Sequence, residues 1–172
     1  ALSYLVDNGH RNIGLIAGSN IHHADRVAGY EMALRAFSIP YRPEYVIRLD
    51  RGFPEDGYQA MRALIQQAPE ITAVFADTDI KAGGAINAVT DAGFTVPGDF
   101  SILGYDDYPG SAEFNPPLTT LRIPYYEIGQ QAVKLLNERI RHGGMDVKGV
   151  VLDTVFIRRD SCGPAVLRKK RK

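Results

Sequence analysis

The sequence predicts an α/β protein built on a doubly wound parallel sheet. Short apolar runs bounded by turn residues alternate with segments of helical periodicity, and four such strand-like runs occur before residue 115. Strands joined through helices return to a sheet by right-handed crossovers, so the expected sheet is parallel. A chain of 172 residues, 45% hydrophobic and 23% charged, has the composition of an ordinary globular domain.

Each expected element has a reason in the sequence. Apolar residues at helical spacing predict the helices, and short apolar runs between turn residues predict buried strands. Gly9 is expected to end the opening helix, while Pro54 and the two acidic residues after it are typical of a helix start. The expected order is helix 1–6, strand 13–17, helix 25–37, strand 45–49, a helix from 54, strand 71–76, helix 78–93 and strand 100–104.

The chain changes character after residue 115. A break at residues 115–117 (Asn-Pro-Pro) precedes an extended stretch, 118–123, and a helix from 124 to 141. That helix has an apolar stripe at helical spacing, formed by Ile128, Ala132, Leu135, Leu136 and Ile140. A second extended stretch, 149–158, follows, and the five basic residues at the end predict a solvated tail.

Charge and cysteine content exclude several classes of protein. Twenty basic and twenty acidic residues give a formal charge of zero, which excludes a non-specific binder of phosphate backbones. The single cysteine, Cys162, cannot form an internal disulfide and favours a reducing compartment. We see no signal peptide, and no apolar run nears the roughly 18 residues of a membrane span. A helix at the very start, without a cap, is typical of a chain cut from a longer protein.

Polar side chains follow every expected strand. Because parallel strands end at one edge of the sheet, these side chains should meet there and form a binding site. Arg26 and Asp106 are the natural pair, since a guanidinium and a carboxylate suit a polyhydroxylated or heterocyclic ligand. Phe53 and Tyr125 offer apolar or stacking surface. The candidates are Ser19, Asn20, His22, His23, Asp25, Arg26, Asp50, Arg51, Phe53, Asp77, Thr78, Asp79, Tyr105, Asp106 and Asp107.

Structural roles remain open for the same residues. Asp106 and Asp107 could cap the following segment, Arg26 could be a solvated helix residue, and Tyr125 could belong to the core.

Catalytic and metal-binding interpretations are weaker. The pairs Asp77/Asp79 and Asp106/Asp107 provide too few oxygen ligands for a hard cation, and Asp79 also has the position of a helix cap. The adjacent histidines at 22 and 23 lack a third zinc ligand near them. No phosphate-binding glycine loop or nucleophile elbow occurs. We expect no metal, no cofactor and no catalytic residue.

An ordered set of short motifs resembles the effector-binding core of the LacI/GalR family of bacterial transcription regulators. The resemblance covers residues 1–161, and the order of the motifs makes it specific although each one alone is weak. They are residues 4–5 (YL), 9–13 (GHRNI), 16–18 (IAG), 26–30 (RVAGY), 33–34 (AL), 57–58 (GY), 72–76 (TAVFA), 96–102 (VPGDFSI), 104–107 (GYDD) and 117–124 (PLTTLRIP).

The resemblance implies a periplasmic-binding-protein-like fold of two lobes, of which this chain is mostly the C-terminal one. Residues 1–121 would form that lobe, 122–148 would cross to the N-terminal lobe and include its helix, and 149–161 would be the returning strand, before a basic tail at 162–172. The apolar stripe of the crossing helix would then lack its usual packing partner. We therefore expect apolar surface there that is exposed in this chain and that is covered by self-association or lies in a disordered segment.

The resemblance also implies site residues and partners. In such relatives, the residues at the positions of Arg26 and Asp106 hold the small molecule. The family often has Asn-Asp where this chain has Thr78-Asp79, and Phe53 and Tyr125 match aromatic positions of the family. It implies a cytoplasmic homodimer that senses a sugar or purine-like effector and contacts operator DNA only through a missing N-terminal helix-turn-helix, with no membrane partner. The alternatives are a periplasmic binding protein for transport or chemotaxis, which needs an export signal, and an α/β enzyme, for which no motif is present.

Overall fold

A computed structural model describes residues 1–142 and 149–166, and its centre is a four-stranded sheet in the order β2-β1-β3-β4. The strands are β1 (Ile13–Gly18), β2 (Val46–Leu49), β3 (Ala73–Ala76) and β4 (Ser101–Leu103), and every neighbouring pair is parallel. The chain first moves outward from β1 to β2, then returns past β1 to β3 and β4. The order therefore reverses between β1 and β3, which confirms the doubly wound parallel sheet.

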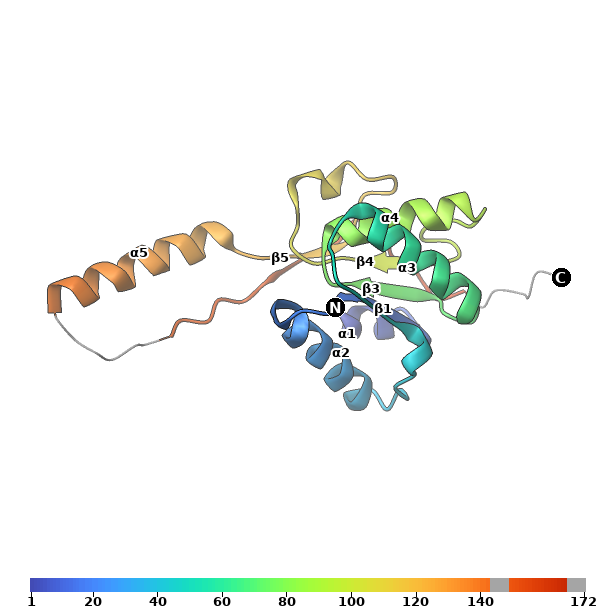
Figure 1. Cartoon of the computed structure of the whole chain (residues 1–172), viewed down its shortest axis with the longest axis horizontal. Helices are drawn as coiled ribbons and strands as arrows, with labels where there is room; N and C mark the ends of the chain where they lie inside the picture. Colours follow the sequence, from blue (N-terminus) through green and yellow to red (C-terminus); the bar gives the residue numbers. More distant parts are fainter. Residues whose placement is uncertain (143–148, 167–172) are drawn as a thin grey trace.

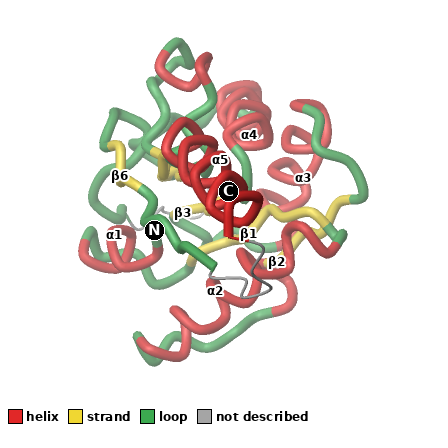
Figure 2. Tube along the Cα trace, turned by 90° about the vertical axis from the view of Figure 1, so that its left-hand side faces the viewer, coloured by secondary structure: helices red, strands yellow, loops and turns green. Residues whose placement is uncertain are grey.

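Helices cover both faces of the sheet (Figures 1 and 2). On one face, apolar side chains of α1 (Leu2–Asp7) and α2 (Ala24–Ala36) form a buried cluster with β1, β3 and β4. On the other, α3 (Pro54–Gln67) and α4 (Asp79–Asp91) bury a second cluster against the same strands. The strands β1, β3 and β4 are buried on both sides, which explains their apolar runs, whereas the edge strand β2 is only partly buried and includes the exposed Arg48.

The helices α3 and α4 touch through glycine. A Cβ atom at Gly57 would collide with the carbonyl oxygen of Lys81, and one at Gly84 would collide with that of Pro54. These two glycines therefore allow the backbones at the start of α3 and α4 to meet. This contact brings the loop after β2 close to the loop after β3.

The crossing segment leaves the sheet beside β4. Main-chain bridges join Leu103 to Thr119 and Asp106 to Arg122, and β5 (Thr120–Arg122) pairs antiparallel with β6 (Val155–Ile157). Between them, α5 (Tyr125–His142) projects away from the sheet (Figure 1).

The apolar stripe of α5 is largely open to solvent. The exposed fractions of Ile128, Leu136 and Ile140 are 43%, 58% and 71%, whereas Leu135 is half-buried. This confirms the expected exposed apolar surface; what covers it stays a prediction.

Most expected elements form, with β2, β3 and β4 shorter than expected and β1 one residue longer. The strand expected at 71–76 begins at Ala73, because Ile71 N bonds back to Ala68 in a turn. The residues before β2 form a 3-10 helix, η2 (Pro43–Tyr45), and of the extended stretch 149–158 only β6 is a strand. Gly9 has a φ of +89°, as its role as a helix stop requires. The helix expected at 124–141 forms as α5, while most of the basic tail lies outside the described residues.

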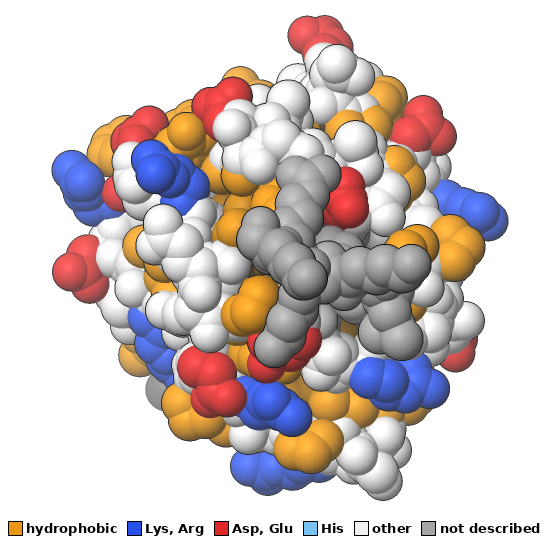
Figure 3. All heavy atoms as spheres, turned by 90° about the vertical axis from the view of Figure 1, so that its right-hand side faces the viewer, with side chains coloured by type: hydrophobic (Ala, Val, Ile, Leu, Met, Phe, Trp, Pro, Cys, Tyr) orange, Lys and Arg blue, Asp and Glu red, His pale blue; other side chains and the backbone are white. Residues whose placement is uncertain are grey.

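Charged side chains of both signs are interspersed on the face opposite α5. Figure 3 shows blue and red side chains spread over that face without a large patch of one sign. This distribution agrees with the formal charge of zero.

Candidate functional site

The loops after β1, β2 and β3 are bonded to one another at the carboxyl edge of the sheet. Gly18 N, at the end of β1, donates to the Asp77 carboxylate at 2.6 Å, and the Ser19 hydroxyl donates to Asp50 at 2.6 Å. We call this edge the rim. It contains the point at which the strand order reverses, where doubly wound sheets bind their ligands.

Arg26 lies at the rim, in the first turn of α2. Its Nη1 donates to the main-chain carbonyl of Asp77 at 2.7 Å, and its Nη2 lies 3.4 Å from Asp106 Oδ1. The guanidinium also covers the ring of Tyr105, 4.2 Å from its centroid. Both Arg26 and Asp106 keep 22% of their side-chain surface exposed, so the structure brings the predicted pair together where a ligand has access.

The environment of Asp106 alters its chemistry. Burial raises the pKa of its carboxyl to about 6; Arg26 opposes this rise, and the carboxylates of Asp79 and Asp77 add to it. The residue has a φ of +118°, an uncommon conformation for a side chain other than glycine. Its main-chain N–H donates to Leu121 at 2.9 Å, which fixes this conformation against β5. A carboxyl group that titrates near pH 6 can accept or donate a hydrogen bond to a ligand hydroxyl.

Asp79 lies in the interior rather than on the rim. Its side chain is fully buried and accepts hydrogen bonds from the hydroxyls of Thr120 and Ser111, each at 2.6 Å, and from Tyr108 N at 2.9 Å. These donors belong to β5 and to the segment after β4. The geometry therefore favours a structural role, in which Asp79 fastens the crossing strand to α4.

Thr78 caps α4 at the rim. Its Oγ1 accepts from Lys81 N at 3.4 Å, and the residue is half-buried, directly after the residue that binds Arg26. A position so close to the pair is compatible with ligand contact.

The two candidate aromatic residues, Phe53 and Tyr125, lie at the starts of different helices. Phe53 is 61% exposed at the start of α3, and the guanidinium of Arg51 lies 6.0 Å above its ring. Tyr125 is 62% exposed at the start of α5. Burial and then the charge of Asp106 raise the pKa of Tyr125, while Arg26 lowers it, so its hydroxyl lies within electrostatic reach of both.

Asp107, the second carboxylate of the Asp106-Asp107 pair, has a structural role. Asp107 binds Arg122 of β5 at 2.6 Å and Arg159, just after β6, at 2.7 Å. Burial alone would raise the pKa of Asp107, but hydrogen bonds from these two arginines hold it below its ordinary value. Asp107 therefore ties both crossing strands to the sheet.

Sequence reasoning missed Lys81. Its ammonium group is 1% exposed and lies 2.6 Å from the carboxylate of Asp77, which is itself fully buried. The available signal was the short spacing between Asp77, just before the N-cap of α4, and Lys81 in its first turn.

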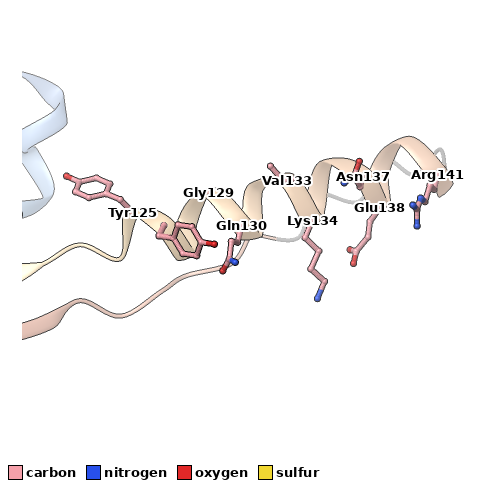
Figure 4. A pocket seen from close by; sticks show the side chains of 9 residues that line it. Tyr125, Gly129, Gln130, Val133, Lys134, Asn137, Glu138 and Arg141 are labelled. Carbon is pink, nitrogen blue, oxygen red and sulfur yellow. The ribbon is translucent and has the colours of Figure 1, made fainter.

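A long open groove runs along α5. It has a volume of about 870 Å³, and the described residues that line it belong to this helix; Figure 4 shows Tyr125 pointing back toward the main body. The lining residues are Tyr125, Tyr126, Gly129, Gln130, Val133, Lys134, Asn137, Glu138 and Arg141.

Residues 1–142 and 149–166 show neither a group of metal ligands nor a helix suited to span a membrane. In that part of the chain, no three His, Cys, Asp or Glu side chains gather as metal ligands would. No helix there combines the length and the apolar character needed to cross a membrane.

Comparison with known proteins gives one consistent family. A model of the periplasmic binding protein-like domain matches residues 2–162. The HTH-type transcriptional repressor PurR of Histophilus somni strain 129Pt is 38% identical over 150 residues, covering 85% of this chain and 44% of the relative. The repressor PurR of Haemophilus influenzae strain PittEE is 41% identical over 145 residues, covering 83% and 43%. The chain thus spans less than half the length of these relatives.

Solved structures agree. The transcriptional regulator CelR in complex with cellobiose superposes with a TM-score of 0.87 at 32% identity, covering 94% of this chain and 50% of that one. The lac repressor dimer bound to operator and the anti-inducer ONPF superposes with a TM-score of 0.85 at 28% identity, covering 94% and 56%.

Proposed function

Because the chain belongs to the periplasmic-binding-protein-like family that includes LacI-type transcriptional regulators, we propose that it is the effector-binding part of such a regulator. The observation that carries this proposal is the pairing of Arg26 with Asp106 at a partly open rim, 3.4 Å apart. Two independent arguments select these residues: the ends of parallel strands and the family resemblance.

The proposed effector is a sugar or a purine-like molecule. Arg26 and Asp106 would hold its oxygen or nitrogen atoms, Thr78 would add a hydroxyl contact, and Phe53 and Tyr125 would supply stacking surface. The CelR structure supports a sugar, because that similar protein is in complex with cellobiose. We leave Asp79 out of the contacts, since three donors already occupy its carboxylate.

The proposed organisation places residues 1–121 in the C-terminal lobe of a two-lobed fold. Residues 122–148 would cross into the other lobe, 149–161 would return from it, and 162–172 would be a basic tail. The projection of α5 and its exposed apolar side chains support this division, since a second lobe would cover them.

Control of DNA would arise from differential binding. An effector that binds one lobe arrangement better than the other shifts the population toward it, and a helix-turn-helix outside this chain would grip the operator in only one arrangement. The lac repressor structure, a dimer on its operator, supports a homodimer here. The proposed regulator acts in the cytoplasm and carries out no catalysis.

Calorimetry on the full-length protein tests the proposal. A panel of sugars, nucleobases and nucleosides should contain a compound that binds, and Arg26→Ala or Asp106→Ala should each weaken its binding at least tenfold, since each removes a charge-assisted contact. Operator binding should respond to that compound in the unchanged protein only. An affinity in both variants that is unchanged from that of the original protein would remove these residues from the site.

A further inference from the structure

A polar cluster lies directly beneath the rim, around the carboxylate of Asp77. Lys81 Nζ lies 2.6 Å from one carboxylate oxygen, while His23 Nδ1 lies 2.7 Å from the other, which also accepts from Gly18 N. We call His23, Asp77 and Lys81 the Asp77 cluster. Its members come from the N-terminus of α2, the end of β3 and the first turn of α4, so it joins three elements at one point.

Stability alone explains this cluster poorly. Removing an ammonium ion and a carboxylate from water costs free energy that their attraction offsets only in good geometry, and an apolar pair of similar volume is often as stable. The buried charges lie between the ends of β1 and β3, where the strand order reverses and ligands bind. A buried ion pair at that place can serve the ligand site as well as the fold.

The cluster reaches Arg26 by two routes. The main-chain carbonyl of Asp77 accepts from Arg26 Nη1 at 2.7 Å, and its carboxylate binds His23, which lies one helical turn before Arg26. His23 Nδ1 also lies 3.5 Å from Arg26 Nη1, but its shorter contact is with Asp77. Both ends of the first turn of α2 are therefore bonded to a single residue.

These bonds leave one side of the guanidinium available. Nη2 faces Asp106 at 3.4 Å, which is long for a charge-assisted hydrogen bond, so a ligand oxygen can replace it at low cost. Tyr105 supports the plane of the group from one face.

We propose that the Asp77 cluster is a positioning unit that holds the guanidinium of Arg26 ready for the ligand. The proposal rests on the proposed function, which gives Arg26 its role as a ligand contact. A side chain that is already ordered loses less entropy on binding. Loss of the link through His23 should therefore weaken effector binding by roughly two- to tenfold.

The carboxyl group of Asp106 reports on the position of Arg26 without any effector. Burial raises its pKa to about 6, and Arg26 lowers it; the other charges that act on it are Asp79, Asp77 and Lys81. Carboxyl carbon NMR of the full-length protein, labelled with ¹³C at the aspartate carboxyls, measures this pKa, and Asp106→Asn assigns the signal. Arg26→Ala should raise the pKa by about half a unit or more, because the cation is lost.

Variants of His23 give the decisive comparison. His23→Ala should raise the pKa of Asp106 in the same direction as Arg26→Ala, because α2 loses its bond to Asp77. His23→Asn should return the pKa to within about 0.2 of the original, since the side-chain N–H of asparagine can take the place of Nδ1 without carrying a charge. If His23→Ala does not fold, His23→Leu, which also lacks a hydrogen-bond donor, replaces it.

Three results would overturn the proposal. An unchanged pKa in His23→Ala would show that the link does not hold Arg26. A value in His23→Asn equal to that in His23→Ala would mean that only the imidazole charge acts. An unchanged pKa in Arg26→Ala would show that the guanidinium does not lie beside Asp106. If the pKa values behave as expected but no compound in the effector panel binds, the proposed function fails and the positioning unit stands.

Discussion

Replacing Lys81 by methionine should destabilise the protein strongly. The side chain is 1% exposed, and its loss leaves the Asp77 carboxylate fully buried with two remaining donors, Gly18 N and His23. Removing one partner of a buried ion pair typically costs about 3–5 kcal/mol. That is a large share of the roughly 5–15 kcal/mol that stabilises a typical domain.

The double variant Lys81→Met/Asp77→Asn should regain most of this loss. It removes both charges at nearly constant volume, and the asparagine carbonyl can still accept from Gly18 N. Urea unfolding of the four proteins at pH 7 should therefore give a coupling free energy of about 2 kcal/mol or more. Lys134→Met, at an exposed position of α5, is the control and should change stability by less than about 0.5 kcal/mol. A Lys81→Met variant as stable as this control, or additive single effects, would refute the buried pair.

Three further predictions concern the contact between α3 and α4, the buried carboxylate of Asp79 and the carboxyl group of Asp106 at the rim. Gly84→Ala should lower the unfolding free energy measured in urea by about 1–3 kcal/mol, because its Cβ meets the Pro54 carbonyl. Gly29→Ala, which has open space around its Cβ in α2, should raise that free energy by about 0.5–1 kcal/mol. Equal effects of the two substitutions would contradict the close contact between Gly84 and Pro54. Asp79→Ala should cost about 3 kcal/mol or more, since it leaves three buried donors without their acceptor, and a loss below about 1 kcal/mol would be inconsistent with that network. The pKa of Asp106 in the folded protein lies near 6, above its ordinary 3.8, so the unfolding free energy of the original protein should fall relative to that of Asp106→Asn as pH rises from about 4 to 6, and stay level above pH 6. Screening by solvent keeps this change well under about 3 kcal/mol. A difference in unfolding free energy between the two proteins that does not depend on pH would rule the shift out.

The layered fold could be predicted from the sequence because its signals are local. The strands β1, β3 and β4 are buried on both faces, so they appear as apolar runs, and the helices between the strands keep their own period. Strand ends were less predictable. Ile71 is as apolar as the residues of β3, but its N–H bonds to Ala68 in a turn, and nothing in its chemistry distinguishes it from a strand residue.

The rim could be predicted as a place, but the division of labour among its residues could not. Asp79 and Asp106 are both aspartates after parallel strands, and sequence reasoning treated both as ligand contacts. The difference arises from Thr120 and Ser111, which lie far along the chain and occupy Asp79 but not Asp106. Long-range donors of this kind leave no local pattern, so only coordinates separate the structural carboxylate from the available one.

Asp77 shows why the support of a site is harder to predict than the site itself. Its bond to Arg26 comes from a main-chain carbonyl, which every residue type would offer at that position. Its side chain instead determines whether α2 stays close enough for that bond to form, through His23, and whether the charge of Lys81 is balanced. A substitution at position 77 therefore leaves the acceptor for Arg26 in place and changes how firmly it is held. We therefore expect a substitution at position 77 to disturb the position of Arg26 more strongly when it removes more of the bonds that the carboxylate makes. No direct contact with the guanidinium is lost, because the main-chain carbonyl remains.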